Sequence, residues 1–407
     1  MPRYYMGVDW ADQTHAVWVG DEHGTPVFER TVPHTADGFS DWSRWLYECQ
    51  AAGIEVWAAI ERPDGRVVEF LLDHGVSVYP INPKALDRAR DRFRMSSSKS
   101  DPFDARVLAE FLRTDQGHLR PLQPNTEAAQ ELKLLTRDYH RVVRQQTRLL
   151  NQLTATLKEY YPQPLHVFED VTTQLALDFL RTYPTPTALA ALRPREWARF
   201  ARGHRLGEAR KAAVWEALQQ PTIPVPAHVV RAKACLVQVL VAQLDTVVSA
   251  IARYQAEIDR FFAALPAAEW MNSLPVGHHG MMVPTIWAEL GDAPDRWQSV
   301  THWQAHAGMV PVTERSGKQH VVRFRFACNS HLRYALDRLA FCSLQRSEWA
   351  RAYYRRQRRL GHSHHRALRA LGAKWAKIIF VMWRQHKPYE EQYHLATMAK
   401  QHLRQVA

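Results

Sequence analysis

The stretch "YYMGVDW" (Tyr4–Trp10) decides how the N-terminal part of the chain is expected to fold. Its apolar residues indicate a buried strand, and Asp9 stands at the end of that strand. "THAVWV" (Thr14–Val19) predicts a second strand, the turn residues Gly20–Gly24 follow it, and Thr25–Val32 predicts a third strand. Three short strands joined by tight turns indicate an antiparallel meander.

After this meander, helices and strands alternate along the chain. Apolar residues recur at helical spacing from Phe39 to Cys49. Two further strands are predicted, "IEVWAAI" (Ile54–Ile60) and "VSVYPI" (Val76–Ile81). The helices between and after them are expected at Gly65–Asp73, at Ala85–Arg92 and from Asp101 onward. Three strands followed by helix, strand, helix, strand, helix is the order of the RNase H-like fold, which includes RuvC.

Four acidic residues occupy positions at which this fold would bring carboxylates together: Asp9, Glu61, Asp101 and Asp104. Strand 1 is central in an RNase H-like sheet and lies beside the strand that runs into Glu61, so both strand-end acids are expected at one edge. The helix that begins near "SDPFDA" can lie across that edge. Converging carboxylates repel one another unless cations lie among them, and hard oxygen ligands suit Mg²⁺. Two such ions could clamp a phosphodiester and stabilise the leaving oxygen.

Each acid also has a purely structural interpretation. Asp101 can be the N-cap of a helix whose first position is Pro102. Asp9 can cap a turn, and Glu61 can pair with a neighbouring arginine. The strand-end positions and the basic character of the chain favour the metal site over these alternatives.

The composition indicates a globular protein with a polyanionic partner. The chain has 407 residues, of which 46% are hydrophobic, so it can form two or three domains with ample cores. Lysine and arginine total 53 against 41 acidic residues, for a formal charge of +12, which favours nucleic acid as the partner. The four cysteines form no CxxC pair, which argues against a thiolate zinc site and against a disulfide framework. The start has no signal core and no apolar run reaches the length of a membrane span, so we expect a cytoplasmic protein.

The middle of the chain has the apolar spacing of a coiled coil. One heptad run extends from Leu132 to Leu153 and a second from Val237 to Phe261. The pattern fits long helices that pair within one chain and equally a dimer. Proline-rich residues 162–226 between the two runs indicate an insert of short helices. Arginines flank the first run and suit either a phosphate backbone or solvent.

The C-terminal third holds a candidate nucleophile and a basic region. Ser316 lies in "ERSGKQH", where nearby cations could stabilise the negative charge that develops when a serine attacks a phosphate; a plain Ser-Gly loop is the alternative. Residues 351–377 are strongly basic with interleaved aromatic residues, as in nucleic-acid-binding surfaces. The cluster His362–His365 is more typical of a solvated loop than of a metal site. The candidate nucleic-acid contacts are Arg315, Lys318, His320, Arg323, Arg325, Arg355, Arg356, Arg358 and Arg359.

Taken in order, these motifs resemble the DEDD-type transposases of bacterial insertion sequences, the recombinases guided by a bridge RNA. "GVDWA", "IERP" and "KSDPFDA" resemble the RuvC-like domain of that family. Residues 272–345 resemble its transposase domain through "LPVGHHG", "WAELGD", "AHAGMVPVTERSGK" and "RFRFACNSHLRYAL". One departure is the corner "PVGHHG", which in the family usually has the pattern Pro-Gly-hydrophobic-Gly.

The resemblance implies a mechanism and partners. Asp9, Glu61, Asp101 and Asp104 would be the acidic tetrad that holds Mg²⁺, and Ser316 would form a covalent phosphoserine link to DNA. A structured noncoding guide RNA would pair with donor and target DNA. The protein would be a homo-oligomer, a dimer or a tetramer, whose active sites can combine domains of different protomers. It would act in the bacterial cytoplasm, associated with the nucleoid.

Three parts of the chain are therefore expected. Residues 1–125 would form a RuvC-like α/β catalytic domain. Residues 126–265 would form coiled-coil helices with the insert at 162–226, and residues 266–407 a mainly helical transposase domain. Two other functions remain open, a RuvC-like nuclease or junction resolvase that uses water, and a non-catalytic nucleic-acid-binding scaffold. A nuclease would not need Ser316, and the complete acidic tetrad argues against a scaffold.

Overall fold

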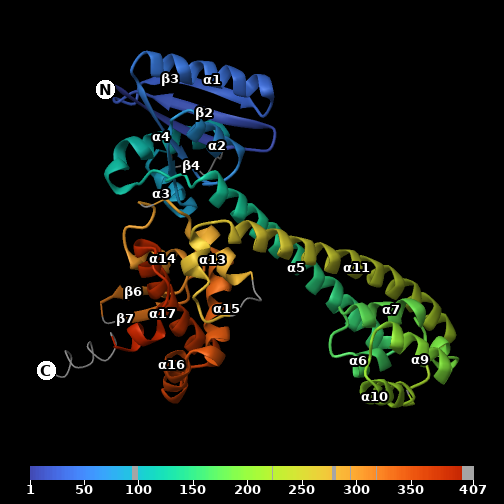
Figure 1. Cartoon of the computed structure of the whole chain (residues 1–407). Helices are drawn as coiled ribbons and strands as arrows, with labels where there is room; N and C mark the ends of the chain where they lie inside the picture. The colour runs from blue at the N-terminus through green and yellow to red at the C-terminus, as the bar shows by residue number, and fades with distance from the viewer. Residues whose placement is uncertain (94–99, 222, 277–280, 294, 318, 397–407) are drawn as a thin grey trace. The chain divides into compact units, whose positions relative to one another are not determined.

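The computed structural model describes residues 1–93, 100–221, 223–276, 281–293, 295–317 and 319–396. The chain divides into two compact units, Met1–Pro124 and Asn125–Ala407 (Figure 1). The first unit is a mixed α/β structure, and the second is mainly helical.

The first unit contains the five predicted strands in one sheet. They are β1 (Arg3–Trp10), β2 (Thr14–Gly20), β3 (Pro26–Pro33), β4 (Glu55–Ile60) and β5 (Ser77–Pro80), in the order β3-β2-β1-β4-β5. The first three strands pair antiparallel, as in a meander, and β4 and β5 continue the sheet in parallel beyond β1. The strand β1 is therefore central and has β4 as a neighbour, as the order of elements predicts.

Helices cover both faces of this sheet. On one face, Met6, Val8 and Ile60 pack against α1 (Ala36–Ala51) and α2 (Arg66–Asp73). On the other face, Tyr5 and Ala59 pack against α3 (Pro83–Phe93) and α4 (Asp101–Asp115), and a short 3-10 helix, η1 (Gln116–His118), follows α4. Because side chains alternate along a strand, odd-numbered residues of β1 face α3 and α4.

Gly7 allows α4 to lie directly on β1. A Cβ atom at Gly7 would be 1.8 Å from the carbonyl oxygen of Ala105 and 2.7 Å from the amide nitrogen of Ala109. Ala16 on β2 packs against the same two alanines. The small residues therefore bring the helix backbone into contact with the sheet, one turn after its N-terminus.

The second unit contains a long antiparallel helix pair (Figure 1). The helices α5 (Glu127–Tyr160) and α11 (Ala227–Ala263) pack along each other. Tyr139 in the first half of α5 accepts a hydrogen bond from Gln255, and Glu159 at the end of α5 pairs with Lys233. The two heptad runs thus pair within one chain, which is one of the two alternatives that the sequence leaves open.

Short helices fill the segment between these long helices, as its prolines predict. They are α6 (Gln163–Val167), α7 (Gln174–Thr182), α8 (Pro186–Ala190), α9 (Pro194–Gly203) and α10 (Glu208–Leu218). Their apolar side chains, among them Phe179 and Trp197, share a core with the adjoining halves of α5 and α11. The insert therefore closes the far end of the helix pair.

One helix in the described part of the chain, α11, is long and apolar enough to cross a membrane by length and composition. Its best 18-residue window has a mean hydropathy of 1.8, so the expectation that no apolar run reaches this length is wrong by this measure. A single such helix is weak support for a membrane span, because core helices of soluble proteins pass the same test.

The C-terminal part of the second unit is a helical core with one hairpin. Its helices are α12 (Ala267–Met271), α13 (Met282–Leu290), α14 (Val300–His306), α15 (Ser330–Arg346), α16 (Glu348–Arg359) and α17 (His364–Gln385). Trp303 and Trp375 are fully buried among them. The strands β6 (Val312–Ser316) and β7 (Gln319–Arg323) form an antiparallel hairpin that the sequence does not predict. Residues 277–280 of the "PVGHHG" corner lie outside the described residues.

Candidate active site

The sheet brings Asp9 and Glu61 to one edge. Val8 and Ile60 are partners in the parallel register of β1 and β4, and each acid is the next residue in the chain. Asp9 lies opposite Ala16, which packs against α4. Glu61 comes two residues after Ala59, so the same alternation, carried one residue beyond β4, directs it to this face as well. Both strand-end acids are half-buried on the side of the sheet that α3 and α4 cover.

The first turn of α4 carries the other two predicted acids. The helix begins at Asp101, and its N-cap is Ser100, so the interpretation of Asp101 as N-cap is displaced by one residue. The Ser100 side chain makes no capping hydrogen bond. Asp101 is exposed, whereas Asp104, one turn later, is only 3% exposed. Asp104 therefore points into the protein beside the backbone contact between α4 and Gly7.

An arginine that the sequence analysis did not single out binds Asp104. Arg90 of α3 donates from Nε to Oδ1 at 2.7 Å and from Nη2 to Oδ2 at 2.8 Å. It also pairs with Asp87. The hydrogen bond with Asp104 raises the pKa of Arg90 against the opposing effect of burial, and the charges of Asp104, Asp87 and Glu61 raise it further. Glu61 and Asp104 therefore both act on the same guanidinium group.

The acidic side chains at this edge of the sheet are suitable ligands for a divalent cation, but in the structure Asp104 binds the cationic side chain of Arg90. Aspartate and glutamate oxygens are the ligands that Mg²⁺ prefers. Among the described residues, however, no group of three or more histidine, cysteine, aspartate or glutamate side chains is close enough to hold a metal ion. Both oxygens of Asp104 accept hydrogen bonds from Arg90. A metal that used Asp104 as a ligand would have to take the place of this arginine.

The structural alternative for Glu61 was an ion pair with a neighbouring arginine, and the contacts of Arg62 and Arg66 do not support it. Arg62 lies 3.9 Å from Asp64 and 4.8 Å from the Trp10 ring centroid, and Arg66 pairs with Glu69 at 3.6 Å. These contacts direct both arginines to partners other than Glu61.

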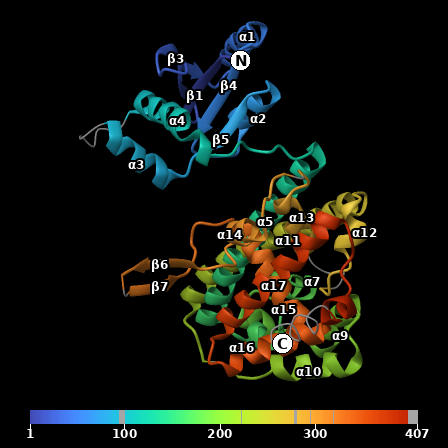
Figure 2. The ribbon, with the colours of Figure 1, turned by 90° about the vertical axis from the view of Figure 1, so that its left-hand side faces the viewer.

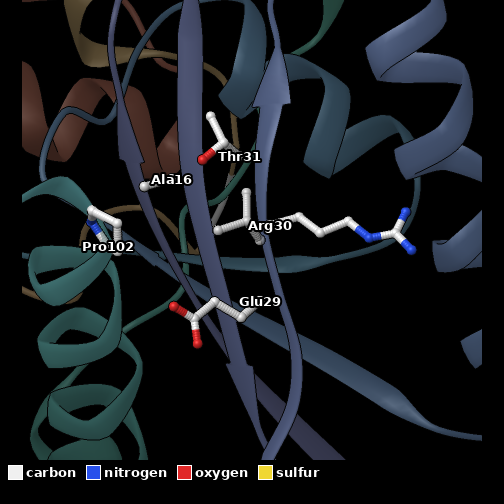
Figure 3. Close-up of a pocket in the computed structure, with 6 residues that line it drawn as sticks. Ala16, Glu29, Arg30, Thr31 and Pro102 are labelled. Carbon is white, nitrogen blue, oxygen red and sulfur yellow. The ribbon is translucent and has the colours of Figure 1, made fainter.

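A pocket borders the acidic edge (Figure 3). It is lined by Ala16, Val17, Glu29, Arg30, Thr31 and Pro102. Ala16 is the cross-strand partner of Asp9, and Pro102 follows Asp101, so the pocket adjoins two of the four predicted acids. Figure 3 shows Glu29 on the side of the N-terminal turn of α4, whereas the Arg30 side chain points away from it.

Ser316 lies in the second unit, at the end of a hairpin strand. It is the last residue of β6 and pairs with Gln319 across a turn in which Gly317 adopts a φ of 55°. A positive φ of this size favours glycine, which explains the Ser-Gly sequence at this turn. Ser316 is exposed.

The predicted nucleic-acid-binding residues near Ser316 differ in exposure and in whether they already bind other groups of the protein. Arg315 and His320 are exposed and face each other across the hairpin. Arg323 pairs with Glu314 at 3.2 Å, and Arg325 is half-buried and donates to the carbonyl oxygen of Val310. Lys318 lies outside the described residues. The exposed pair remains the better candidate for a phosphate contact.

The basic helix α16 presents four exposed arginines: Arg355, Arg356, Arg358 and Arg359. The histidines that follow make hydrogen bonds within the protein, His362 with Gln357 at 2.7 Å and His364 with Tyr354 at 2.7 Å. The basic residues are thus accessible to phosphates, while these two histidines act as local structural contacts.

Sequence reasoning also missed a buried polar network in the second unit. Glu289 of α13 is only 1% exposed and binds Arg137 and Asn329. A single acid within the apolar helix "MVPTIWAEL" is the signal that could have identified it. Arg90 carries no comparable signal, because it is one of several arginines in "DRARDRFR".

Comparison with known proteins identifies the family. Residues 6–162 match the DEDD-type IS110 transposase family, described as "Transposase", and residues 273–355 match the "Transposase IS116/IS110/IS902 family". The "Mini-circle putative transposase for IS117" of Streptomyces coelicolor is 32% identical over 379 residues, 90% of each chain. The "Putative transposase y4uE" of Sinorhizobium fredii is 37% identical over 204 residues, 50% of this chain and 57% of the relative. The chain therefore belongs to the IS110/IS116/IS902 family of insertion-sequence transposases and is a DNA transposase.

Proposed function

We propose that the protein is an RNA-guided DNA recombinase that cuts and rejoins strands through a covalent phosphoserine intermediate. In this proposal the first unit is an RNase H-like, RuvC-like domain, and Asp9, Glu61, Asp101 and Asp104 are its acidic tetrad. The observation that carries the proposal is that Asp9 and Glu61 follow paired residues at the ends of neighbouring strands, in the sheet against which Gly7 allows α4 to pack closely. The strand order β3-β2-β1-β4-β5 also supports it.

The tetrad would hold Mg²⁺, which supplies charge neutralisation for a phosphodiester and for the oxygens that attack and leave it. The chain's own residues have separate tasks. Asp9 and Glu61 are set by strand register, so the sheet holds them in place. Asp104 would bind the metal after Arg90 is displaced from its two oxygens, and Asp101 is exposed and accessible to an incoming strand.

Ser316 would begin the reaction by attack on a DNA phosphorus atom. Its Oγ forms a bond to phosphorus, its proton passes to a base in the solvent or on the protein, and the bond from phosphorus to the DNA 3′ oxygen breaks. The 3′ oxygen takes up a proton and leaves as a hydroxyl. A 3′ hydroxyl of another strand then attacks the phosphoserine, restores a phosphodiester and releases the serine. The exposed Arg315 and His320 can help to neutralise the negative charge that develops on the phosphate.

The alternative is a nuclease that uses water, and the two mechanisms differ in whether the cut DNA becomes covalently attached to Ser316. The test compares Ser316→Ala with Thr313→Ala, because Thr313 is an exposed hydroxyl residue on the same strand. Wild type and Thr313→Ala should form a protein–DNA adduct that survives denaturation, and peptide mapping should locate it at Ser316. Ser316→Ala should bind DNA and form no adduct. Normal cleavage by Ser316→Ala would instead support the nuclease.

The tetrad has its own test. Asp9→Asn, Glu61→Gln and Asp101→Asn should each abolish strand cleavage while the protein remains folded. Asp101 is the most informative of these residues, because Ser100 is the N-cap and the change therefore leaves the cap intact. The control is Asp138→Asn, a partly exposed acid of α5 that pairs with Arg141. Cleavage at the wild-type rate by Asp101→Asn would remove Asp101 from the tetrad.

Guide RNA, oligomeric state and location belong to the same proposal. The net charge of +12 and the exposed arginines of α16 support binding to a structured noncoding RNA as well as to donor and target DNA. We further propose a dimer or tetramer in the bacterial cytoplasm. The protein should be purified from cells that express the flanking element, and the bound RNA should be sequenced. Recovery of one defined RNA would support guidance, and recovery of random cellular RNA would contradict it.

A further inference from the structure

The buried carboxylate of Glu289 is the centre of a network that joins three helices of the second unit. Arg137 of α5 donates from Nε to Oε1 at 2.7 Å and from Nη2 to Oε2 at 3.1 Å. Asn329, the N-cap of α15, donates from Nδ2 to Oε2 at 2.7 Å. Burial alone would raise the pKa of Glu289, but the hydrogen bond and charge of Arg137, with Lys133 and Asn329, hold that pKa below its usual value. The carboxylate is therefore ionised and fully engaged.

Asn329 carries this network to the segment that holds Ser316. Its backbone N–H donates to the carbonyl oxygen of His306 at 2.8 Å, and its Nδ2 lies 3.3 Å from His306 Nε2. Its Oδ1 accepts from the amide of Leu332 and caps α15. His306 ends α14, and Asn329 precedes α15, so the two residues join the start and the end of residues 307–328.

The hairpin within this segment depends on its base. Figure 2 shows β6 and β7 standing out from the helices of their unit. A two-stranded hairpin is marginally stable by itself in water. Near its base, Arg325 donates to the carbonyl oxygen of Val310 at 3.2 Å, and Arg333 donates to that of Arg325 at 3.4 Å. The orientation of Ser316 at the far end is thus set by how firmly the base is held.

We propose that Glu289 is a positioning residue that, through Asn329 and His306, holds both ends of the Ser316 segment against α5 and α13. This inference rests on the proposed role of Ser316 as nucleophile. Glu289 itself touches no reacting atom. Its carboxylate locks the Asn329 amide, and the Asn329 backbone locks the end of α14. A hairpin anchored in this way presents the serine hydroxyl in one orientation, which attack on a phosphate requires.

Glu289→Gln tests this role, because it keeps the size of the side chain and removes its charge. The variant should bind DNA with an affinity within about twofold of wild type, since Glu289 is buried. The rate at which it forms the Ser316 adduct should fall by about tenfold or more. Hydrogen exchange of residues 307–328 should rise by a similar factor, because loss of a hydrogen bond to a charged group favours local opening. The control is Glu257→Gln on α11, where a partly exposed acid pairs with Arg260 in the same unit. This control should change neither the rate of adduct formation nor the hydrogen exchange of residues 307–328.

Asn329→Ser is a second variant that separates positioning from folding. Serine is a good N-cap, so α15 keeps its start, while the side-chain link to Glu289 is lost. In this variant too, the backbone amides of residues 307–328 should exchange hydrogen faster, and the Ser316 adduct should form more slowly. Unchanged exchange in either folded variant would overturn the proposal. If wild type forms no adduct at Ser316, the proposed function fails, yet the exchange measurement still decides whether Glu289 holds the segment.

Discussion

Two buried carboxylates, one in each unit, accept the same pair of hydrogen bonds from an arginine. Arg90 binds Asp104 through Nε and Nη2, and Arg137 binds Glu289 through the same two nitrogens. Asp104 is 3% exposed and Glu289 is 1% exposed. By chemistry and burial alone, the two pairs would be assigned the same role.

Their surroundings differ. Asp104 lies in the first turn of α4, on the face of the sheet that Asp9 and Glu61 also occupy, and Glu61 acts on Arg90 as well. Glu289 lies in the last turn of α13 and has Asn329 as a further donor. We therefore expect that the Asp104 pair can exchange its arginine for another cation, and that the Glu289 pair, completed by a neutral amide, is a structural contact. The neighbours of an ion pair therefore indicate its role better than the pair itself.

The largest effect is expected from Arg137→Ala. This change leaves the Glu289 carboxylate buried without its ionic partner, which costs about 3–5 kcal/mol. Chemical denaturation should show this loss in the free energy of unfolding, and added Mg²⁺ should not restore it. Recovery in Mg²⁺ would show that Glu289 can also bind a cation, and the distinction between the two pairs would fail.

Arg90→Ala should cost about 3 kcal/mol for the same reason, and here Mg²⁺ should restore part of the loss. Without the guanidinium group, the Asp104 oxygens are available to a divalent cation, on the face of the sheet that Asp9 and Glu61 also occupy. The measurement is the melting temperature with and without millimolar Mg²⁺. An identical response to Mg²⁺ in Arg90→Ala and Arg137→Ala would contradict the exchange of arginine for metal.

The network around Glu289 should also depend on pH through His306. Burial and the nearby charge of Arg296 lower the pKa of His306 to about 4, from an ordinary value of about 6.5. The unfolded chain therefore binds a proton that the folded protein does not, so the stability that this residue contributes is complete above pH 6.5 and decreases as the pH falls toward 4. The loss reaches about 3 kcal/mol. In His306→Gln, the free energy of unfolding, measured by chemical denaturation, should change less between pH 6.5 and pH 4 than in wild type. An equal change in both proteins would contradict the role of His306 in this pH dependence.

Gly7→Ala tests the first unit alone and should cost at least about 1–3 kcal/mol. The added methyl group would meet the backbone of Ala105, so α4 must move away from β1 and carry Asp101 and Asp104 with it. Gly117→Ala is the control, because a Cβ atom there meets nothing within 4 Å. Denaturation measures the stability, and strand cleavage should fall in Gly7→Ala alone. Full cleavage by Gly7→Ala would show that the acidic edge does not need this close contact.

Local patterns predicted much of the first unit. The apolar strands, their order and the acids at the ends of β1 and β4 follow from alternation and turn residues, which act over a few positions. The hairpin of β6 and β7 was missed because most of its residues are exposed and polar, so no apolar alternation marks it. The short helices of the insert were predictable, because each proline-rich break interrupts a helix.

By itself, the sequence determined which residues share a face of the sheet and that two long helices need apolar partners, because side-chain period is a local property of the backbone. Only the tertiary structure decided which partners they find. The two heptad runs pair with each other, and the folded insert between them shares a core with the adjoining halves of both helices. Arg90 reaches Asp104, and Arg137 reaches Glu289 across 152 positions, because helices packed on a common core bring together side chains that no local pattern relates.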